Sequence, residues 1–214
     1  MVLISHKYKF IYIKNRKVAG SSVQSFFGKY CINPKSNYSY KDGIDNIDKF
    51  GIIGSEGTSD IHSLRKPNNW KGHKLSEDIK RDLGEKIFNE YFKFCVIRNP
   101  YDKMVSLYHY NLSGSKKISF KEFVKSTECN NLHIHSINEK SICDYYIRYE
   151  YLKEDIIRLC KILKIDSYDL SLLPKHKSTQ RNNIKHWSEY YDDETREIVF
   201  NKHKKEFELF GYNF

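Results

Sequence analysis

Basic and small residues gather in one short segment near the start of the chain. Residues 14–22 read KNRKVAGSS and follow an apolar run at residues 9–13 that predicts a buried strand. Glycine and serine after a strand are typical of a helix start, where backbone N–H groups lack intrahelical partners and the helix dipole is positive. Such a corner binds anions, and lysine and serine side chains add charge and hydrogen bonds. The alternative is an ordinary helix cap whose basic side chains lie in solvent.

A second corner of the same kind lies further along the chain. Residues 92–97 read FKFCVI, the clearest strand pattern in the sequence, and Arg98 follows at once. Asn99 and Pro100 predict a helix start, and Ser106 lies two turns along that helix. Ligands of open α/β sheets bind at the carboxyl ends of strands. Two such corners therefore predict a ligand that carries two anionic groups.

The elements that would position these residues belong to one predicted domain. A length of 214 residues suits a single domain with a proper core and is short for two. Periodicity is poor over residues 31–70, which predicts a loop-rich binding region. The predicted strands are 9–13, 92–97 and 142–149, and the predicted helices are 21–29, 76–90, 100–108, 120–125, 153–163 and 192–205.

Composition indicates which class of partner and which cellular compartment to expect. The net charge of +10 favours an anionic partner, although a lysine-rich composition alone gives the same charge. No apolar run approaches the roughly 18 residues that span a membrane. Five cysteines without a C-x-x-C pair, and no signal peptide, predict reduced thiols in a soluble cytoplasmic protein. No cysteine or histidine stands at metal-ligand spacing from the pair His133 and His135, so no metal is expected.

Together the two corners resemble the sulfotransferases that use 3′-phosphoadenosine 5′-phosphosulfate (PAPS), and most closely their carbohydrate, Golgi-type branch. Residues 17–22 are similar to the family's K-x-x-G-T/S-S/T loop. Residues 98–108 are similar to its R-N-P-x-D-R/K-x-x-S-x-Y motif, with Lys103 where arginine is commoner. Segments that start at Trp70 and Glu150 also look like family segments, so the resemblance extends over nearly the whole chain.

The resemblance implies a fold, a reaction and a set of site residues. The fold would be a P-loop-like, three-layer α/β/α domain over residues 1–214, with a central parallel sheet flanked by helices. The reaction would be in-line transfer of a sulfuryl group from PAPS to a hydroxyl or amine of a carbohydrate or similar acceptor, without a metal. Lys17 would stabilise the leaving oxygen, and Arg98 and Ser106 would hold the 3′-phosphate. The implied donor-binding residues are Lys14, Lys17, Ala19, Gly20, Ser21, Ser22, Arg98, Ser106, Ser178 and Arg181.

A histidine is the candidate general base. An acceptor hydroxyl is a poor nucleophile until its proton is removed, and histidine suits this task at neutral pH. His73 occupies the position that matches the family histidine, on a loop just before the helix start predicted at Ser76, and is the first choice. His62 is the second choice. The alternative for His73 is a residue that packs the loop or orients the acceptor.

Two functions of other kinds compete with sulfuryl transfer. A phosphoryl-transfer enzyme uses a similar loop, but the pattern G-x-x-x-x-G-K-[ST] is absent, because Lys17 precedes Gly20. A nucleic-acid-binding module fits the charge and the 17 tyrosines, but no zinc-finger, helix-turn-helix or RNP pattern is present. We therefore expect no nucleic-acid partner. The sequence does not identify the acceptor or the oligomeric state.

Overall fold

Two compact units make up the part of the chain that the structure describes. The structure is a computed structural model, and it describes residues 2–36, 45–55, 69–70, 72–112, 118–173 and 185–214. Unit 1 comprises Met1–Ile97 and Leu132–Pro174, and unit 2 comprises Arg98–Asn131 and Lys175–Phe214. The single domain over residues 1–214 stays a prediction.

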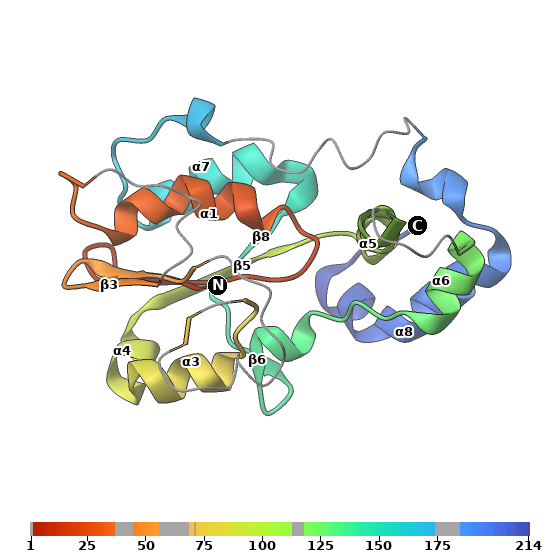
Figure 1. The fold of residues 1–214 in the computed structure, drawn as a ribbon, viewed down its shortest axis with the longest axis horizontal. Helices are drawn as coiled ribbons and strands as arrows, with labels where there is room; N and C mark the ends of the chain where they lie inside the picture. Colours follow the sequence, from red (N-terminus) through yellow and green to blue (C-terminus); the bar gives the residue numbers. More distant parts are fainter. Residues whose placement is uncertain (1, 37–44, 56–68, 71, 113–117, 174–184) are drawn as a thin grey trace. The chain divides into compact units, whose positions relative to one another are not determined.

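A mixed β-sheet forms the centre of unit 1 (Figure 1). In spatial order its strands are β3 (Asn46–Asp48), β4 (Gly51–Ile53), β1 (Val2–Ser5), β2 (Phe10–Ile13), β5 (Phe92–Ile97) and β8 (Tyr145–Arg148). β2 pairs in parallel with β5, and β5 pairs in parallel with β8. β1 pairs antiparallel with β2 and β4, and β3 pairs antiparallel with β4. A separate hairpin pairs β6 (Ser136–Ile137) with β7 (Lys140–Ser141).

The predicted parallel sheet is right for β2, β5 and β8 and wrong for the other three strands of this sheet. Only residues 6–9 join β1 to β2, with Lys9 at a φ of 49°. A connection this short joins antiparallel neighbours, because a parallel pair needs a crossover of a dozen or more residues. β1 and β2 also differ from the predicted order, in which the strand at residues 9–13 came first.

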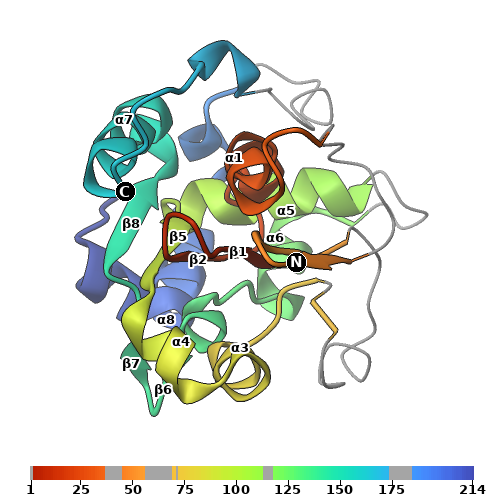
Figure 2. The ribbon, with the colours of Figure 1, turned by 90° about the vertical axis from the view of Figure 1, so that its left-hand side faces the viewer.

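Helices cover both faces of this sheet, which confirms the predicted three-layer arrangement for unit 1 (Figure 1, Figure 2). Helices α1 (Gly20–Gly28) and α7 (Leu152–Ile162) lie on one face, and α3 (Ser76–Leu83) and α4 (Glu85–Glu90) lie on the other. The core under α1 is aromatic, with the ring of Phe27 centred 5.7 Å from that of Phe10 and 5.0 Å from that of Phe94. Short 3-10 turns complete unit 1: η1 (Lys29–Cys31), η2 (Leu132–Ile134), η3 (Tyr149–Tyr151) and η4 (Leu170–Leu172).

One predicted helix is two helices. The apolar stripe predicted a single helix over residues 76–90, but Gly84 between α3 and α4 has a φ of 86°. That conformation lies outside the helical region and is open to glycine because glycine has no Cβ. The break changes the direction of the chain while both halves keep their apolar residues, Ile79 and Phe88, buried.

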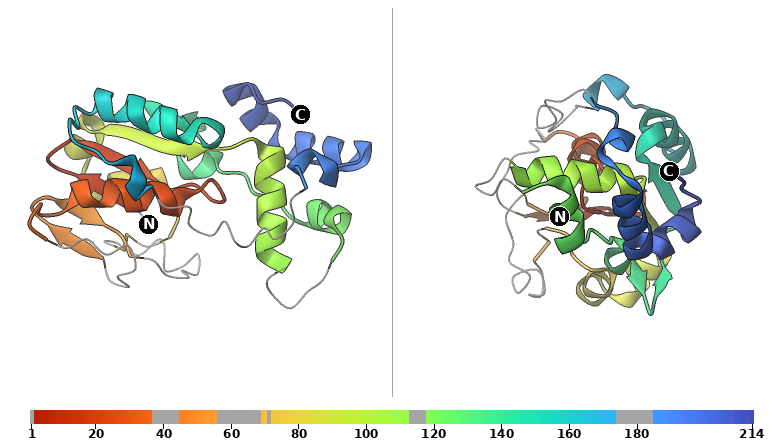
Figure 3. Two further views of the ribbon diagram at one scale, coloured as in Figure 1. Left: turned by 90° about the horizontal axis from the view of Figure 1, so that it is seen from above. Right: turned by 90° about the vertical axis from the view of Figure 1, so that its right-hand side faces the viewer.

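Unit 2 is helical (Figure 3). Asn99 caps α5 (Pro100–Leu112) as predicted, because its Oδ1 accepts a hydrogen bond from the Tyr101 N–H at 2.9 Å. The core of unit 2 holds a buried ion pair, in which Lys103 Nζ lies 2.5 Å from Glu206 Oε2. His203 Nδ1 lies 2.9 Å from the same oxygen. The elements of unit 2 are α5 (Pro100–Leu112), α6 (Phe120–Ser126), η6 (Trp187–Tyr190) and α8 (Asp193–Phe210).

No helix among the described residues is both long enough and apolar enough to cross a membrane.

Candidate functional site

The loop between β2 and α1 has a backbone shape suited to an anion. Lys17 and Ala19 adopt the left-handed conformation, with φ angles of 59° and 60°, whereas Val18 between them does not. A left-handed residue followed by a right-handed one, as Ala19 is by the helical Gly20, turns successive backbone N–H groups toward one side, an arrangement that binds anions. The left-handed conformation costs a residue with a Cβ roughly 1–2 kcal/mol. The contacts around the loop therefore hold it in this shape.

The first turn of α1 offers backbone donors at the end of this loop. The N–H groups of Ser22 and Val23 both bond to the carbonyl oxygen of Ala19, at 3.0 and 3.4 Å. The N–H groups before them, at Gly20 and Ser21, have no partner within the helix. No acidic side chain lies in this turn, so nothing on the helix itself offsets its positive dipole end.

Lys14 lies along this helix start. Its Nζ donates to Gln24 Oε1 at 3.0 Å and to Ser21 Oγ at 3.4 Å. The approach is close at the first position of α1, because a Cβ on Gly20 would lie 3.0 Å from Lys14 Cγ and 3.1 Å from the Tyr12 hydroxyl oxygen and would have to displace them by a few tenths of an ångström. The sequence therefore places a lysine ammonium group directly beside the open end of α1.

Asn15 holds the loop to the sheet, and sequence reasoning missed it. Its side chain is buried, and its Nδ2 donates to the carbonyl oxygen of Val96 at 2.9 Å. This bond joins the carboxyl end of β2 to that of its parallel neighbour β5. The other amide atom, Oδ1, is buried without a hydrogen-bond partner among the described residues. An asparagine in a basic segment reads as a surface residue, so only the structure reveals this role.

His73 lies against the same loop. Its Nδ1 is 2.8 Å from the carbonyl oxygen of Lys14. A carbonyl oxygen can only accept a hydrogen bond, so Nδ1 carries the proton and Nε2 carries the lone pair of the neutral ring. This tautomer leaves Nε2 as the basic atom of the side chain, which is the geometry that a general base requires.

The environment of His73 keeps its ring neutral. Burial, and after it nearby positive charges that include Lys14 and Arg16, lower the pKa of His73 to about 3, while the hydrogen bond to the Lys14 carbonyl opposes the shift. The neutral form is the one that can accept a proton, but a pKa of about 3 makes the ring a weak base, because a general base works best with a pKa near the operating pH. An anion bound at the loop would offset the charges of Lys14 and Arg16 and would raise this pKa.

The second predicted corner lies in unit 2, at the start of α5. Arg98 and Asp102 are buried and form an ion pair in which Arg98 Nε and Nη2 lie 2.8 and 2.7 Å from Asp102 Oδ2. This pair fixes the orientation of the guanidinium group, which is a planar donor suited to phosphate. Ser106 lies one helical turn after Asp102 and therefore on the same face of α5.

The structure thus places the predicted residues in three groups. His73 lies beside the loop in unit 1, within hydrogen-bond distance of the Lys14 carbonyl. His62, Ser178 and Arg181 lie outside the described residues. The other predicted donor-binding residues are Lys14, Lys17, Ala19, Gly20, Ser21 and Ser22 in unit 1 and Arg98 and Ser106 in unit 2.

A second cluster of reactive side chains was also missed by sequence reasoning. One ligand atom each of Cys95, His135 and Cys143 lies within 4.8 Å of the other two. The pair His133 and His135 predicted no metal, because no further ligand stood at a familiar spacing in the sequence. The two cysteines come from 40 residues before and 8 residues after His135, and folding brings them together.

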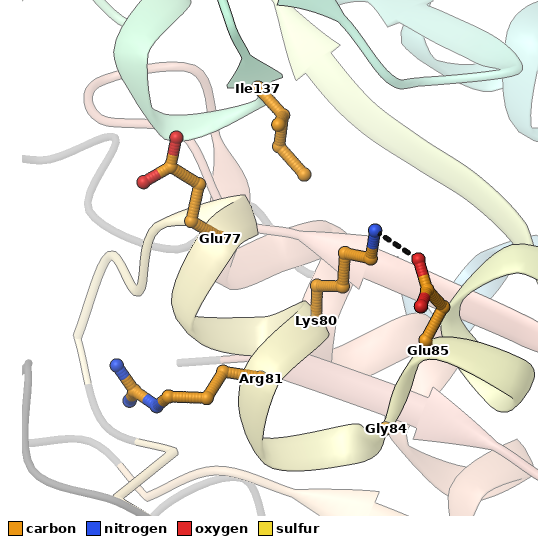
Figure 4. A pocket seen from close by; sticks show the side chains of 6 residues that line it. All are labelled: Glu77, Lys80, Arg81, Gly84, Glu85 and Ile137. Carbon is orange, nitrogen blue, oxygen red and sulfur yellow. Dashed lines mark ion pairs between the residues drawn. The ribbon is translucent and has the colours of Figure 1, made fainter.

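A pocket of about 390 Å³ lies on the α3–α4 side of unit 1 (Figure 4). An ion pair of 2.6 Å between Lys80 Nζ and Glu85 Oε1 lies on its wall and lowers the pKa of the Glu85 carboxyl. The lining residues are Glu77, Lys80, Arg81, Gly84, Glu85 and Ile137. None of the predicted site residues is among them, so we assign this pocket no part in the chemistry.

Comparisons with known proteins show which family the chain resembles. A family model described as "Sulfotransferase family" matches residues 1–213. An uncharacterized protein of Archaeoglobus fulgidus is 37% identical to the chain over 91 residues, which are 39% of this chain and 76% of that protein. No match was found among solved structures. The family match covers both units, and therefore includes both of the corners described above.

Proposed function

The chain belongs to the sulfotransferase family, and we propose that the loop between β2 and α1 holds the donor's 5′-phosphosulfate for transfer to a carbohydrate hydroxyl or amine. Enzymes of this family use PAPS as the sulfate donor, so the chain is a PAPS-dependent sulfotransferase. The strand–loop–helix of β2 and α1, with its left-handed residues and open first turn, supports a P-loop-like role for this corner.

The donor carries two anionic groups, and the chain has a basic corner of the right chemistry for each. In the proposal, the backbone N–H groups of the loop and of α1 bind the 5′-phosphosulfate together with Lys14, Ser21 and Ser22. Lys17 lies beside the oxygen that bridges phosphorus and sulfur, where negative charge develops as the sulfur–oxygen bond breaks. Arg98 and Ser106 bind the 3′-phosphate, and Ser178 and Arg181 contribute further donor contacts.

His73 is the proposed base. Its Nε2 removes the proton of the acceptor hydroxyl while the acceptor oxygen forms its bond to sulfur, and the bridging oxygen leaves with the bonding pair. The observation that supports this proposal best is the 2.8 Å hydrogen bond from Nδ1 to the Lys14 carbonyl, because it sets the tautomer and places the ring beside the donor loop. His62 is the second candidate for the base.

The acceptor class rests on coarser support. The net charge of +10 suits an acceptor that is itself acidic, such as a sulfated or uronic-acid-containing glycan. A hydroxyl compound of another class would use the same donor loop and the same base.

The test is transfer of labelled sulfate from PAPS to a panel of glycans and small hydroxyl compounds. Lys17→Ala removes the charge at the leaving oxygen, and we expect a loss of kcat of about 100-fold or more. His73→Asn keeps a donor at the place of Nδ1 and removes the basic nitrogen, so we expect a loss of kcat of about 100-fold with an unchanged KM for PAPS. Lys153→Ala, which removes an exposed lysine on α7, is the matched control.

Different outcomes separate the parts of the proposal. Normal turnover of the Lys17→Ala variant would refute the role of Lys17 at the leaving oxygen. Full activity of His73→Asn, with activity lost only in His73→Ala, would show that the hydrogen bond to Lys14 matters and that the base lies elsewhere. Tighter binding of Mg²⁺–ATP than of PAPS would favour the phosphoryl-transfer alternative.

A further inference from the structure

The cluster of Cys95, His135 and Cys143 is the strongest feature of unit 1 that the sulfotransferase reaction does not use. Cys95 lies on β5, His135 follows η2, and Cys143 lies between β7 and β8. One ligand atom from each residue lies within 4.8 Å of the other two. We propose that these three side chains bind one thiophilic divalent cation, for which Zn²⁺ fits the ligand set best.

The backbone around the cluster is held in place without a metal. The hairpin of β6 and β7 is closed at its base, where the Ile142 N–H donates to the His135 carbonyl at 3.0 Å. On the other side of Cys143, the Asp144 N–H donates to the Lys93 carbonyl at 2.7 Å, and Asp144 Oδ2 accepts from the Lys93 N–H at 2.7 Å. Cys143 is therefore fixed between the hairpin and the strand that carries Cys95.

Hydrogen bonds also set the orientation of the His135 ring. Ser141 Oγ donates its one proton to the His135 carbonyl at 3.3 Å. With that proton committed, it accepts from its two other neighbours, the Tyr146 hydroxyl at 2.5 Å and His135 Nδ1 at 2.9 Å. In this arrangement Nδ1 carries the ring proton, and Nε2 carries the lone pair that binds the cation. A histidine whose second nitrogen donates to a fixed acceptor is the usual arrangement of metal-bound imidazole.

The ligand set and the charge balance favour zinc. Two thiolates and a neutral imidazole around Zn²⁺ give a site of zero net charge, which suits the buried positions of Cys95 and His135. In tetrahedral zinc sites the bond lengths place neighbouring ligand atoms about 3.7 Å apart. The cluster therefore needs a contraction of about 1 Å at most. Cys143 is only half-buried, so a water molecule can reach the fourth position.

The ligand types argue against the other common cations. Ca²⁺ and Mg²⁺ prefer oxygen ligands, of which this cluster offers none. Binding of Zn²⁺ releases the two thiol protons, so affinity should rise with pH. The bound ion would join the central strand β5 to the segment that carries the hairpin. The proposal concerns residues outside the donor loop and does not rest on the proposed function.

The test measures metal content and thermal stability of the full chain. The protein is stripped with a chelator, dialysed against ZnCl₂ and analysed for zinc by mass spectrometry. We expect one zinc per chain, a rise in Tm on adding ZnCl₂, and thiolate-to-metal charge-transfer absorption when Co²⁺ replaces Zn²⁺. In Cys143→Ser we expect at least a tenfold loss of zinc affinity and no rise in Tm.

Matched variants make the result decisive. Cys95→Ala should lose zinc as Cys143→Ser does, whereas Cys160→Ala removes an equally buried thiol on α7 outside the cluster and should keep it. If Cys95→Ala fails to fold, Cys143→Ser remains a sufficient test because that side chain is only half-buried. Equal zinc binding by Cys143→Ser and Cys160→Ala would overturn the proposal. So would a metal-free protein in which Cys95 and Cys143 form a disulfide, or a chain that binds no zinc at all.

Discussion

His73 offers the sharpest test of the site, because one hydrogen bond sets its tautomer and its surroundings lower its pKa. Burial and the nearby charges of Lys14 and Arg16 lower the pKa of His73 from 6.5 to about 3. That shift corresponds to a difference of roughly 5 kcal/mol between the two protonation states. The folded protein therefore keeps the ring neutral at pH values where the unfolded chain already binds a proton.

Stability should follow this difference in proton binding. Because the folded pKa is below the unfolded one, the contribution of His73 is fully present above pH 6.5 and decreases by about 1.4 kcal/mol per pH unit as the pH falls toward 3. The His73→Asn variant lacks this titration and keeps a donor for the Lys14 carbonyl. The difference in unfolding free energy between the native protein and the variant should therefore shrink by about 2 kcal/mol from pH 7.5 to pH 5.

Two measurements check the reasoning. Urea unfolding of both proteins at several pH values gives the free-energy difference. NMR titration of the histidine rings, with His73 assigned by its absence in His73→Asn, gives the pKa directly. A His73 pKa near 6.5, or a free-energy difference that does not change with pH, would refute the account. Addition of 3′-phosphoadenosine 5′-phosphate should raise the pKa of His73, because its anionic groups offset the charges of Lys14 and Arg16.

Three further predictions concern contacts described above. Gly20→Ala should displace the lysine stem packed against that position and raise the KM for PAPS about tenfold, with little change in Tm. Asp102→Asn leaves the charge of Arg98 buried without its carboxylate and should lower the free energy of unfolding by about 3 kcal/mol. Burial raises the pKa of Glu206, but Lys103 and the adjacent histidine lower it to about 2 overall. The contribution of the Glu206 carboxylate to the free energy of unfolding should therefore be present above about pH 4.5 and be lost as the pH falls toward 2. The Glu206→Gln variant should not show this loss of stability.

Each of these predictions has its own contrary result. An unchanged KM for PAPS in Gly20→Ala would show that the close approach of Lys14 to α1 does not serve donor binding. Urea unfolding of Asp102→Asn at the wild-type midpoint would show that the ion pair with Arg98 contributes nothing to stability. Acid unfolding curves that coincide for Glu206→Gln and the native protein would place the acid-sensitive group elsewhere.

Local patterns in the sequence predicted the parts of the fold that depend on neighbouring residues. The strand at residues 92–97 and the helix start at Asn99 and Pro100 are confirmed, because their apolar run, cap and first turn are contiguous. The direction of β1 could not be predicted in this way. It depends on a four-residue turn that allows only an antiparallel neighbour, and the positive φ angle of Lys9 in this turn is not signalled by a glycine or asparagine.

The candidate site shows the same difference between local patterns and contacts that are distant in the sequence. The basic loop was predicted from residue types and their order, and His73 was predicted because it matches the position of the family histidine. Asn15 was missed because its role depends on a carbonyl 81 residues away, and a polar side chain in a basic segment gives no sign of burial. The cluster of Cys95, His135 and Cys143 was missed because the three residues do not stand at a familiar metal-ligand spacing in the sequence. They come together only when the chain folds.

The left-handed conformations of Lys17 and Ala19 bear on how the donor loop responds to its ligand. A loop built from glycine is free to sample many shapes, and binding an anion must then remove that freedom. Lys17 and Ala19 both carry a Cβ, and the fold has already confined them to one narrow region of backbone space. Glycine at either position should therefore relieve strain and raise stability, while the looser loop binds the donor more weakly. Stability and affinity are thus expected to change in opposite directions at these two positions.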